Sequence, residues 1–153
     1  MGTDQIMDPI TVRIMRHDDM SAIVELDSLT SGMPRGEYLQ ARVGQALDNP
    51  HSEVLSLVAE SQGRVAGFLM AQVYLGEFGI PETVANVDTV GVHPEFQLRG
   101  VAKVLMDELL QHARKLGIER IRTMVSWEQG DLIGYFRNAG FAPGACLVLE
   151  RSL

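Results

Sequence analysis

The stretch VDTVGVHPEFQLRGVAKVLMDELLQHARKL, residues 87–116, joins three local patterns without a break. It begins as an apolar strand and passes through a His93-Pro94 turn into a loop of small residues. A long amphipathic helix follows, from about residue 99 to residue 116. The first N–H groups of a helix have no partner within it and carry partial positive charge. We therefore expect this strand, loop and helix start to bind an anion, and we interpret the site as one for a diphosphate.

The loop and the first turn of the helix supply the groups for such a site. Backbone N–H groups can converge on phosphate oxygens where the side chains are small, which is the case at Gly100 and Ala102. An alternative is that these two residues only let the helix pack closely on a sheet. Arg99 and Lys103 either add charge contacts to phosphates or are solvated. The candidate binding residues are Gln97, Leu98, Arg99, Gly100, Val101, Ala102 and Lys103.

Composition places the chain among ordinary globular proteins. Of its 153 residues, 46% are hydrophobic and 22% are charged, which suits one domain with a core of its own. We expect a flexible tail at residues 1–9 and a single domain at residues 10–153. The formal net charge of −7 argues against binding to nucleic acid or to anionic lipid. It suits a cationic substrate, although an acidic surface that serves solubility is the simpler explanation.

The sequence gives no sign of a membrane segment or a secretory signal. No apolar run approaches the roughly 20 residues that span a bilayer, and the first residues lack the basic and apolar parts of a signal peptide. Cys146 is the one cysteine, so an internal disulfide is excluded. We therefore expect a cytoplasmic protein. The four histidines are scattered without metal-ligand spacing, so we expect no metal site.

Periodicity and turn residues predict an α/β chain in the order β-α-α-β-β-β-α-β-α-β. Alternating or β-branched runs indicate strands, apolar residues at helical spacing indicate helices, and Gly63 supplies the turn of a hairpin. The predicted strands are residues 10–16, 54–60, 65–74, 83–93, 120–127 and 146–151. The predicted helices are residues 20–29, 36–47, 99–116 and 131–139.

Two motifs stand at matching places in this order. The phrase V-H-P-E-F-Q-L-R-G-V-A at 92–102 contains Gln97, Gly100 and Ala102, and Y-F-R-N-A-G-F at 135–141 ends in Gly140-Phe141. Together they resemble the GNAT superfamily of acyl-CoA-dependent N-acyltransferases, over nearly the whole chain. The resemblance implies a mixed, mostly antiparallel central sheet, flanked by about four helices, with splayed central strands. It also implies acetyl-CoA as co-substrate.

The resemblance assigns further parts of the cofactor site. In the family, the strand before the loop pairs through its backbone with the pantetheine arm, which implies Val90 and Val92 here. An N–H group near Val90 then polarises the thioester carbonyl. Phe136 is expected to pack on the pantetheine, and residues 97–103 hold the diphosphate.

The reaction also requires a residue that removes a proton from the amine. An alkyl ammonium with a pKa near 10 must lose a proton before it attacks a thioester. Asn86 and Asp88 share one face of the strand, where the family places Glu or His, and only Asp88 can act as a base there. We expect it to act through water, or else to be a carboxylate bonded to its neighbours. Glu37, Glu77 and Glu82 are the alternative bases.

Where the family usually has a tyrosine as general acid, this sequence has Phe136. Tyr135 stands one residue earlier, about 100° away around a helix. We predict Tyr135 as the proton donor to the leaving thiolate. The alternative is that Tyr135 belongs to the core or to a dimer surface, and the thiolate takes its proton from water.

Three functions fit these residues. The first is transfer of an acetyl group to a primary amine of a small molecule, peptide or protein by direct attack in a ternary complex. The second is transfer of a larger acyl group or to a different acceptor, and the third is a non-catalytic acyl-CoA-binding sensor. Arg35, Tyr38 and Arg42 are either a site for an acidic group of the substrate or a solvated helix face. The resemblance also implies a homodimer that pairs near residues 146–151.

Overall fold

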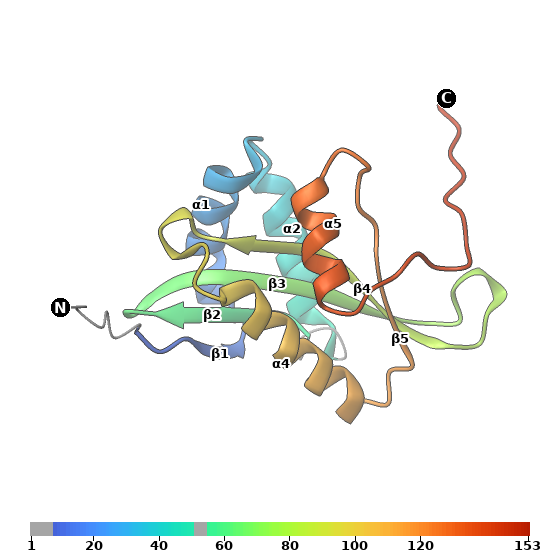
Figure 1. Ribbon diagram of the computed structural model, residues 1–153, viewed down its shortest axis with the longest axis horizontal. Helices are drawn as coiled ribbons and strands as arrows, with labels where there is room; N and C mark the ends of the chain where they lie inside the picture. Colours follow the sequence, from blue (N-terminus) through green and yellow to red (C-terminus); the bar gives the residue numbers. More distant parts are fainter. Residues whose placement is uncertain (1–7, 51–54) are drawn as a thin grey trace.

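The computed structural model, which describes residues 8–50 and 55–153, is built on one five-stranded sheet (Figure 1). The strands lie in the order in which they occur along the chain, and four helices flank them. The strands are β1 (Thr11–Ile14), β2 (Leu57–Ser61), β3 (Arg64–Leu75), β4 (Thr83–Val92) and β5 (Arg120–Thr123). The helices are α1 (Met20–Ser31), α2 (Gly36–Asp48), α4 (Val101–Lys115) and α5 (Gly130–Asn138). Short 3-10 turns are η1 (His17–Asp19), η2 (Glu77–Gly79) and η3 (Pro94–Phe96).

The sheet is mixed and mostly antiparallel. β1 to β4 pair antiparallel with their neighbours, whereas β5 pairs parallel to β4 after the crossover through α4. The predicted fold class is thereby confirmed. The hairpin between β2 and β3 is also confirmed, with Gln62 and Gly63 both at positive φ (55° and 69°), as a two-residue type I′ turn requires. Residue 54, where the first strand of this hairpin was expected to begin, lies outside the described residues.

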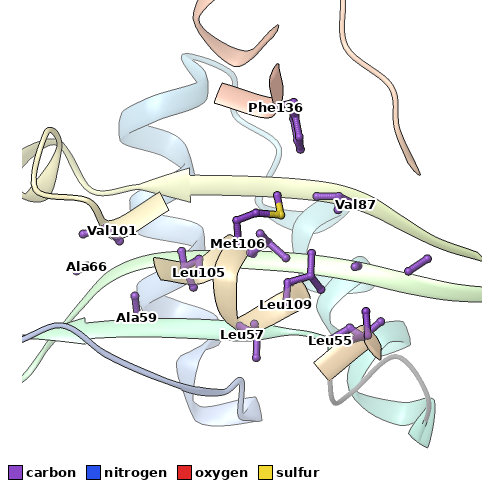
Figure 2. Packing of buried hydrophobic residues seen from close by; sticks show 14 of the residues in the cluster. Leu55, Leu57, Ala59, Ala66, Val87, Val101, Leu105, Met106, Leu109 and Phe136 are labelled. Carbon is purple, nitrogen blue, oxygen red and sulfur yellow. The ribbon is translucent and has the colours of Figure 1, made fainter. Parts of the chain in front are cut away.

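Each face of the sheet buries its own hydrophobic cluster. One lies under α4 and includes Leu105, Leu109 and, from α5, Phe136 (Figure 2). The other lies between the sheet and the helices α1 and α2, and it contains Phe68 and Met70 from β3. β3 and β4 are therefore packed against helices on both faces of the sheet, and this packing holds the two strands in position.

Two glycines set how closely the helices approach the middle of the sheet. A Cβ on Gly67 in β3 would stand 2.7 Å from Val101 Cγ1, at the start of α4. A Cβ on Gly91 in β4 would stand 2.8 Å from the Phe68 ring and 3.0 Å from Leu26 of α1. The start of α4 therefore lies against β3 because position 67 has no side chain.

The prediction of a last strand at residues 146–151 is wrong. Residues 146–151 form no strand, and the sheet ends at β5. β5 itself ends at Thr123, four residues before the predicted end. β-type residues favour an extended backbone, but a strand also needs a paired neighbour, and residues 146–151 pair with no strand of the described chain. Among the described helices, none combines the length and the apolar character needed to cross a membrane.

We predict that Gly67→Ala destabilises the fold by about 1–3 kcal/mol, because the added methyl group overlaps Val101. Urea unfolding monitored by circular dichroism measures the change. The matched control is Gly44→Ala in α2, where a Cβ meets nothing within 4 Å. That control is expected to gain about 0.5–1 kcal/mol from helix propensity. Equal stability of Gly67→Ala and the parent protein would contradict the close-packing argument.

Candidate active site

The outer edge of β4 presents backbone groups that β3 does not use. Antiparallel pairs alternate between residues that bond each other and residues whose N–H and C=O groups point outward. The His93 N–H donates to the Ala66 carbonyl at 2.8 Å, and Val92 and Val90 occupy the outward positions of the register that follows. The backbone groups of Val90 and Val92 therefore point toward the β5 side of β4.

β5 does not reach these groups. Its pairing with β4 covers only Val84–Val87 against Arg120–Thr123, and the Thr123 hydroxyl donates to the Val87 carbonyl at 3.1 Å. Beyond that point the described chain places no strand beside β4. The Val92 carbonyl accepts from the Gln97 side-chain amide at 3.4 Å, which ties the strand edge to the loop that follows. The expected splay is thus present, and an extended, amide-bearing molecule can add to this edge as a strand does.

The loop before α4 is held in a left-handed conformation at two places. Leu98 has a φ of 61° and Gly100, the N-cap residue of α4, has a φ of 81°. No side chain caps the helix, and its first internal bond runs from Val104 N–H to the Gly100 carbonyl. A Cβ on Gly100 would meet nothing within 4 Å, so close packing does not account for this glycine. The backbone conformation does, and it leaves the first N–H groups of α4 free to bind an anion.

Positive side chains stand beside this loop. The guanidinium groups of Arg99 and Arg64 lie over the Phe96 ring, 5.5 Å and 5.3 Å from its centre. Arg64 is paired with Glu95 at 2.6 Å, and Lys103 is paired with Asp107 at 2.6 Å. A hollow of about 370 Å³ opens here, lined by Gln62, Arg64, Glu95, Phe96 and Arg99. Arg99 has no ion-pair partner within the described parts of the chain, so it is the cation most available to a phosphate.

Asp88 stands where the β3–β4 register shifts, and Arg42 of α2 holds it. The register shifts between Met70 and Ala71, which pair with Thr89 and Val87, so Asp88 is the extra residue of a β-bulge. The Arg42 guanidinium donates to the Asp88 carboxylate. Burial lowers the pKa of Arg42, but the charge and hydrogen bond of Asp88 outweigh burial and raise it. Asp88 is therefore an ion-pair partner of a permanently charged group.

A second carboxylate lies close to this pair. Glu77 of η2 accepts from the Asn86 side-chain amide at 3.5 Å, and Asn86 is two residues before Asp88 on the same strand. The Asn86 Oδ1 atom is buried and accepts no hydrogen bond from the described residues. Glu82 is instead paired with Arg120 at 3.1 Å, and Glu37 is exposed on α2. Of the three alternative bases, Glu77 is the one that accepts a hydrogen bond from Asn86, two residues before Asp88.

Tyr135 does not point freely into the site. Its hydroxyl donates to the Ala102 carbonyl at 2.8 Å, which joins α5 to the first turn of α4. Burial raises the pKa of Tyr135 well above its ordinary value, and the charge of Asp107 adds to that rise. Phe136 is buried and packs against the rings of Tyr135 and Phe141. α5 therefore packs on the cofactor-side helix through one hydroxyl and one aromatic cluster.

Arg35, the N-cap residue of α2, and Arg42 within α2 both form ion pairs inside the fold. Arg35 donates to both carboxylate oxygens of buried Asp27, at 2.8 Å and 2.7 Å, and Arg42 pairs with Asp88. Tyr38 is half-exposed on the same helix. Neither cation is simply solvated, because each is paired with a carboxylate of the chain, and binding of an acidic group by these residues stays a prediction.

Comparisons with known proteins agree with this geometry. The model of the Acetyltransferase (GNAT) family matches residues 20–141, so the chain belongs to this family and is an acyltransferase. An acetyltransferase of Pectobacterium atrosepticum is 28% identical over 93% of this chain and 94% of its own. The mycothiol acetyltransferase of Thermobifida fusca is 26% identical over 77% of this chain, which spans only 43% of that longer protein.

Solved structures show the same fold. The aminoglycoside N-acetyltransferase AAC(6')-Iy, in complex with CoA, superposes with a TM-score of 0.78 at 20% identity, over 95% of each chain. The aminoglycoside 6'-N-acetyltransferase AAC(6')-IG of Acinetobacter haemolyticus has a TM-score of 0.77 at 16% identity, over 94% of this chain and 98% of its own.

The partner of Asp88 is the main feature that the sequence did not predict. Arg42 and Asp88 are 46 residues apart, and nothing in the spacing of either residue points to the other. The role of Gly67 was also missed, although a glycine inside a strand is a recognised sign of close backbone approach.

We predict that Tyr135→Phe lowers stability by about 0.5–1.5 kcal/mol, through loss of the bond to Ala102. Because the folded state raises the pKa of Tyr135, its stabilisation is fully present below about pH 10 and declines as the pH rises further. The difference in the free energy of unfolding between Tyr135→Phe and the parent protein should therefore become smaller above pH 10. Thermal unfolding between pH 7 and 11 measures it, with Tyr38→Phe as the half-exposed control. If the difference in the free energy of unfolding does not change with pH, the Tyr135 hydroxyl does not stabilise the fold in this way.

Proposed function

We propose that this chain transfers an acetyl group from acetyl-CoA to a primary amine of a small molecule, peptide or protein. The observation that carries the proposal is a single continuous surface. The open outer edge of β4 leads through Gln97 and the left-handed loop to the uncapped start of α4. An amide-bearing arm fits the first part and a diphosphate fits the second, and CoA is a molecule with both.

The cofactor is proposed to lie along this surface in one direction. Its diphosphate meets the N–H groups at the start of α4, with Arg99 adding charge from the loop, and its pantetheine arm pairs with Val92 and Val90. The thioester then stands near the end of the β4–β5 pairing, where an N–H group of the strand polarises its carbonyl. The CoA complex of AAC(6')-Iy supports this choice of co-substrate.

The reaction proposed is direct attack. The amine nitrogen bonds to the thioester carbon, the tetrahedral intermediate collapses, and the C–S bond breaks to release CoA and the amide. AAC(6')-Iy has been solved with a bisubstrate analog that contains CoA and an acetylneamine, which supports a ternary complex here. The Asn86 Oδ1 atom, buried without a described donor, can accept from the incoming amine, and Glu77 beside it favours a cationic acceptor.

The proposed base is Asp88, acting through water. Its ion pair with Arg42 fixes the position of the carboxylate, so that it can orient a water along which the proton passes to bulk solvent. Glu77 is the competing candidate. For the leaving group, a thiolate with a pKa near 8.5 gains little from a partly buried tyrosine whose raised pKa makes it hold its proton more tightly than usual. We therefore propose that Tyr135 positions α5 and that water protonates the thiolate.

Thiol release tests the function. We predict release of free CoA from acetyl-CoA only when a suitable amine from a panel of aminoglycosides, polyamines and lysine peptides is present. Gly100→Glu should abolish release and the rise in melting temperature with CoA, because it puts bulk and negative charge at the diphosphate. Gly100→Ala, whose Cβ enters open space, shares the strain at positive φ and should keep measurable CoA binding. CoA binding without release on any amine would favour an acyl-CoA sensor.

The pH dependence of turnover separates the two carboxylates. Asp88→Asn is predicted to lower kcat/KM by about 10²–10⁴ at pH 7 and progressively less as the pH approaches the pKa of the amine. Glu77→Gln makes the same chemical change on the neighbouring group and should cost less than tenfold. If the ratio of kcat/KM between Asp88→Asn and the parent enzyme does not change with pH, Asp88 is not the base. A larger, pH-dependent loss for Glu77→Gln assigns the role to Glu77.

A further inference from the structure

The turn η2 holds an aromatic residue in a conformation that such residues rarely adopt. Phe78 has a φ of 53° and a ψ of 32°, in the left-handed region, and it is 91% exposed. Gly76 before the turn and Gly79 within it also have positive φ, of 76° and 73°. A bulky residue with positive φ is an outlier that the surrounding structure must hold in place, and such outliers gather at active sites and ligand-binding sites.

Backbone hydrogen bonds fix the shape of this turn, which lies in the connection that projects beyond the sheet between β3 and β4 (Figure 1). The Gly76 N–H donates to the Glu82 carbonyl at 3.1 Å, and the Ile80 N–H donates to the Glu77 carbonyl at 3.0 Å. Phe78 belongs to neither of the hydrophobic clusters that the described residues form. The turn therefore holds the Phe78 ring in solvent, although a glycine at this position would avoid the strain.

The same turn carries a carboxylate that no cation of the described residues neutralises. The Glu77 side chain accepts from the Asn86 amide at 3.5 Å, and it forms no ion pair within residues 8–50 and 55–153. The two arginines of β5 that stand nearby, Arg120 and Arg122, are both turned to Glu82, at 3.1 Å and 3.8 Å. Glu77 is therefore a negative charge that a cationic group of a ligand can neutralise.

We propose that Glu77 and the Phe78 ring form a subsite for a second cationic group of the acceptor. The subsite rests on the proposed function, in which the reacting amine of the acceptor lies near Asp88. A carboxylate attracts an ammonium group through its charge, and an aromatic ring attracts it through its electron-rich face. The two residues are adjacent in a turn of fixed shape, and the exposed ring has room to turn toward a cation at Glu77.

The spacing along β4 sets the length of the acceptor. Asp88 and Asn86 are two residues apart on the strand, which is roughly 7 Å. The Glu77 carboxylate is 3.5 Å from the Asn86 amide. An acceptor with two cationic nitrogens about 7–10 Å apart can therefore place one near Asp88 and the other at Glu77. The subsite favours an elongated diamine or a longer polycationic amine, and it disfavours an acceptor with a carboxylate at that distance.

Binding of two matched amines tests the subsite without requiring turnover. 1,6-Diaminohexane and hexylamine have the same carbon chain, but only the diamine carries a second ammonium group. Calorimetric titration into the CoA-loaded protein should give a lower Kd for the diamine, with about two- to fivefold from each of the two contacts. Equal Kd values for the two amines, or no binding of either amine, overturn the proposal.

Variants of the turn assign the diamine preference, the ratio of the two Kd values, to its residues. Phe78→Leu and Glu77→Gln should each lower this ratio about two- to fivefold, whereas Phe78→Tyr keeps an aromatic face and should retain it. Leu75→Ala, at an 80% exposed position of the same hairpin, is the matched control and should change nothing. Phe78→Gly suits the left-handed backbone, so it should lose the preference but melt no lower than the parent protein. A preference that survives in Phe78→Leu or in Glu77→Gln overturns the subsite.

Thiol release from acetyl-CoA separates the subsite from the proposed function. A diamine preference in binding without thiol release on any amine would support the subsite and contradict the proposed function. Thiol release with the same kcat/KM for both amines would do the opposite. In the active enzyme, Phe78→Leu should raise KM for the diamine and leave kcat and the KM for acetyl-CoA unchanged, because the ring contacts the distal cation. A lower kcat with an unchanged KM for the diamine overturns this placement of Phe78.

Discussion

The site depends on one break in hydrogen bonding. β4 is paired along its whole length with β3, but its other edge is paired only as far as Val87. Backbone N–H and C=O groups that are neither paired nor hydrated carry a large cost, so an edge left open in the middle of a sheet is a place for a ligand with amides of its own. The bulge at Asp88 falls where this opening begins, and it turns the carboxylate toward α2 rather than along the strand.

The rest of the fold holds the two halves of the surface in a fixed relation. The turn η3 and the loop after it are short, and the Gln97 amide bonds back to the Val92 carbonyl. Gly67 brings the start of α4 down onto β3, and the Tyr135 hydroxyl holds the same first turn from the other side. The uncapped end of α4 is thus positioned by packing and hydrogen bonds that exist before any cofactor binds, and this lowers the entropy lost on binding.

The sequence predicted what is local. The hairpin at Gly63, the helix that starts after Gly100 and the fold class all follow from patterns within a few residues, reinforced by motifs with fixed spacing. The site was predictable where it is backbone, because a glycine before a long amphipathic helix implies free N–H groups. Its side-chain chemistry was not, because the partners of Asp88 and Tyr135 come from 46 and 33 residues away. The prediction of a final strand was wrong for the same reason. Its residues favour an extended backbone, but local sequence does not show whether they pair with another strand.

In the proposed reaction, the ion pair of Arg42 and Asp88 constrains how the proton leaves the amine. The Arg42 guanidinium donates to the Asp88 carboxylate and holds it in place. Such a pair is suited to orient a water, and the Glu77 carboxylate accepts a hydrogen bond from the neutral Asn86 amide. The pair also cancels its own charge, which leaves Glu77 as the net negative charge next to Asn86. The cationic acceptor of the proposed reaction is therefore expected to depend on η2, a turn with the exposed, left-handed Phe78 at its centre, rather than on the strand that holds Asp88.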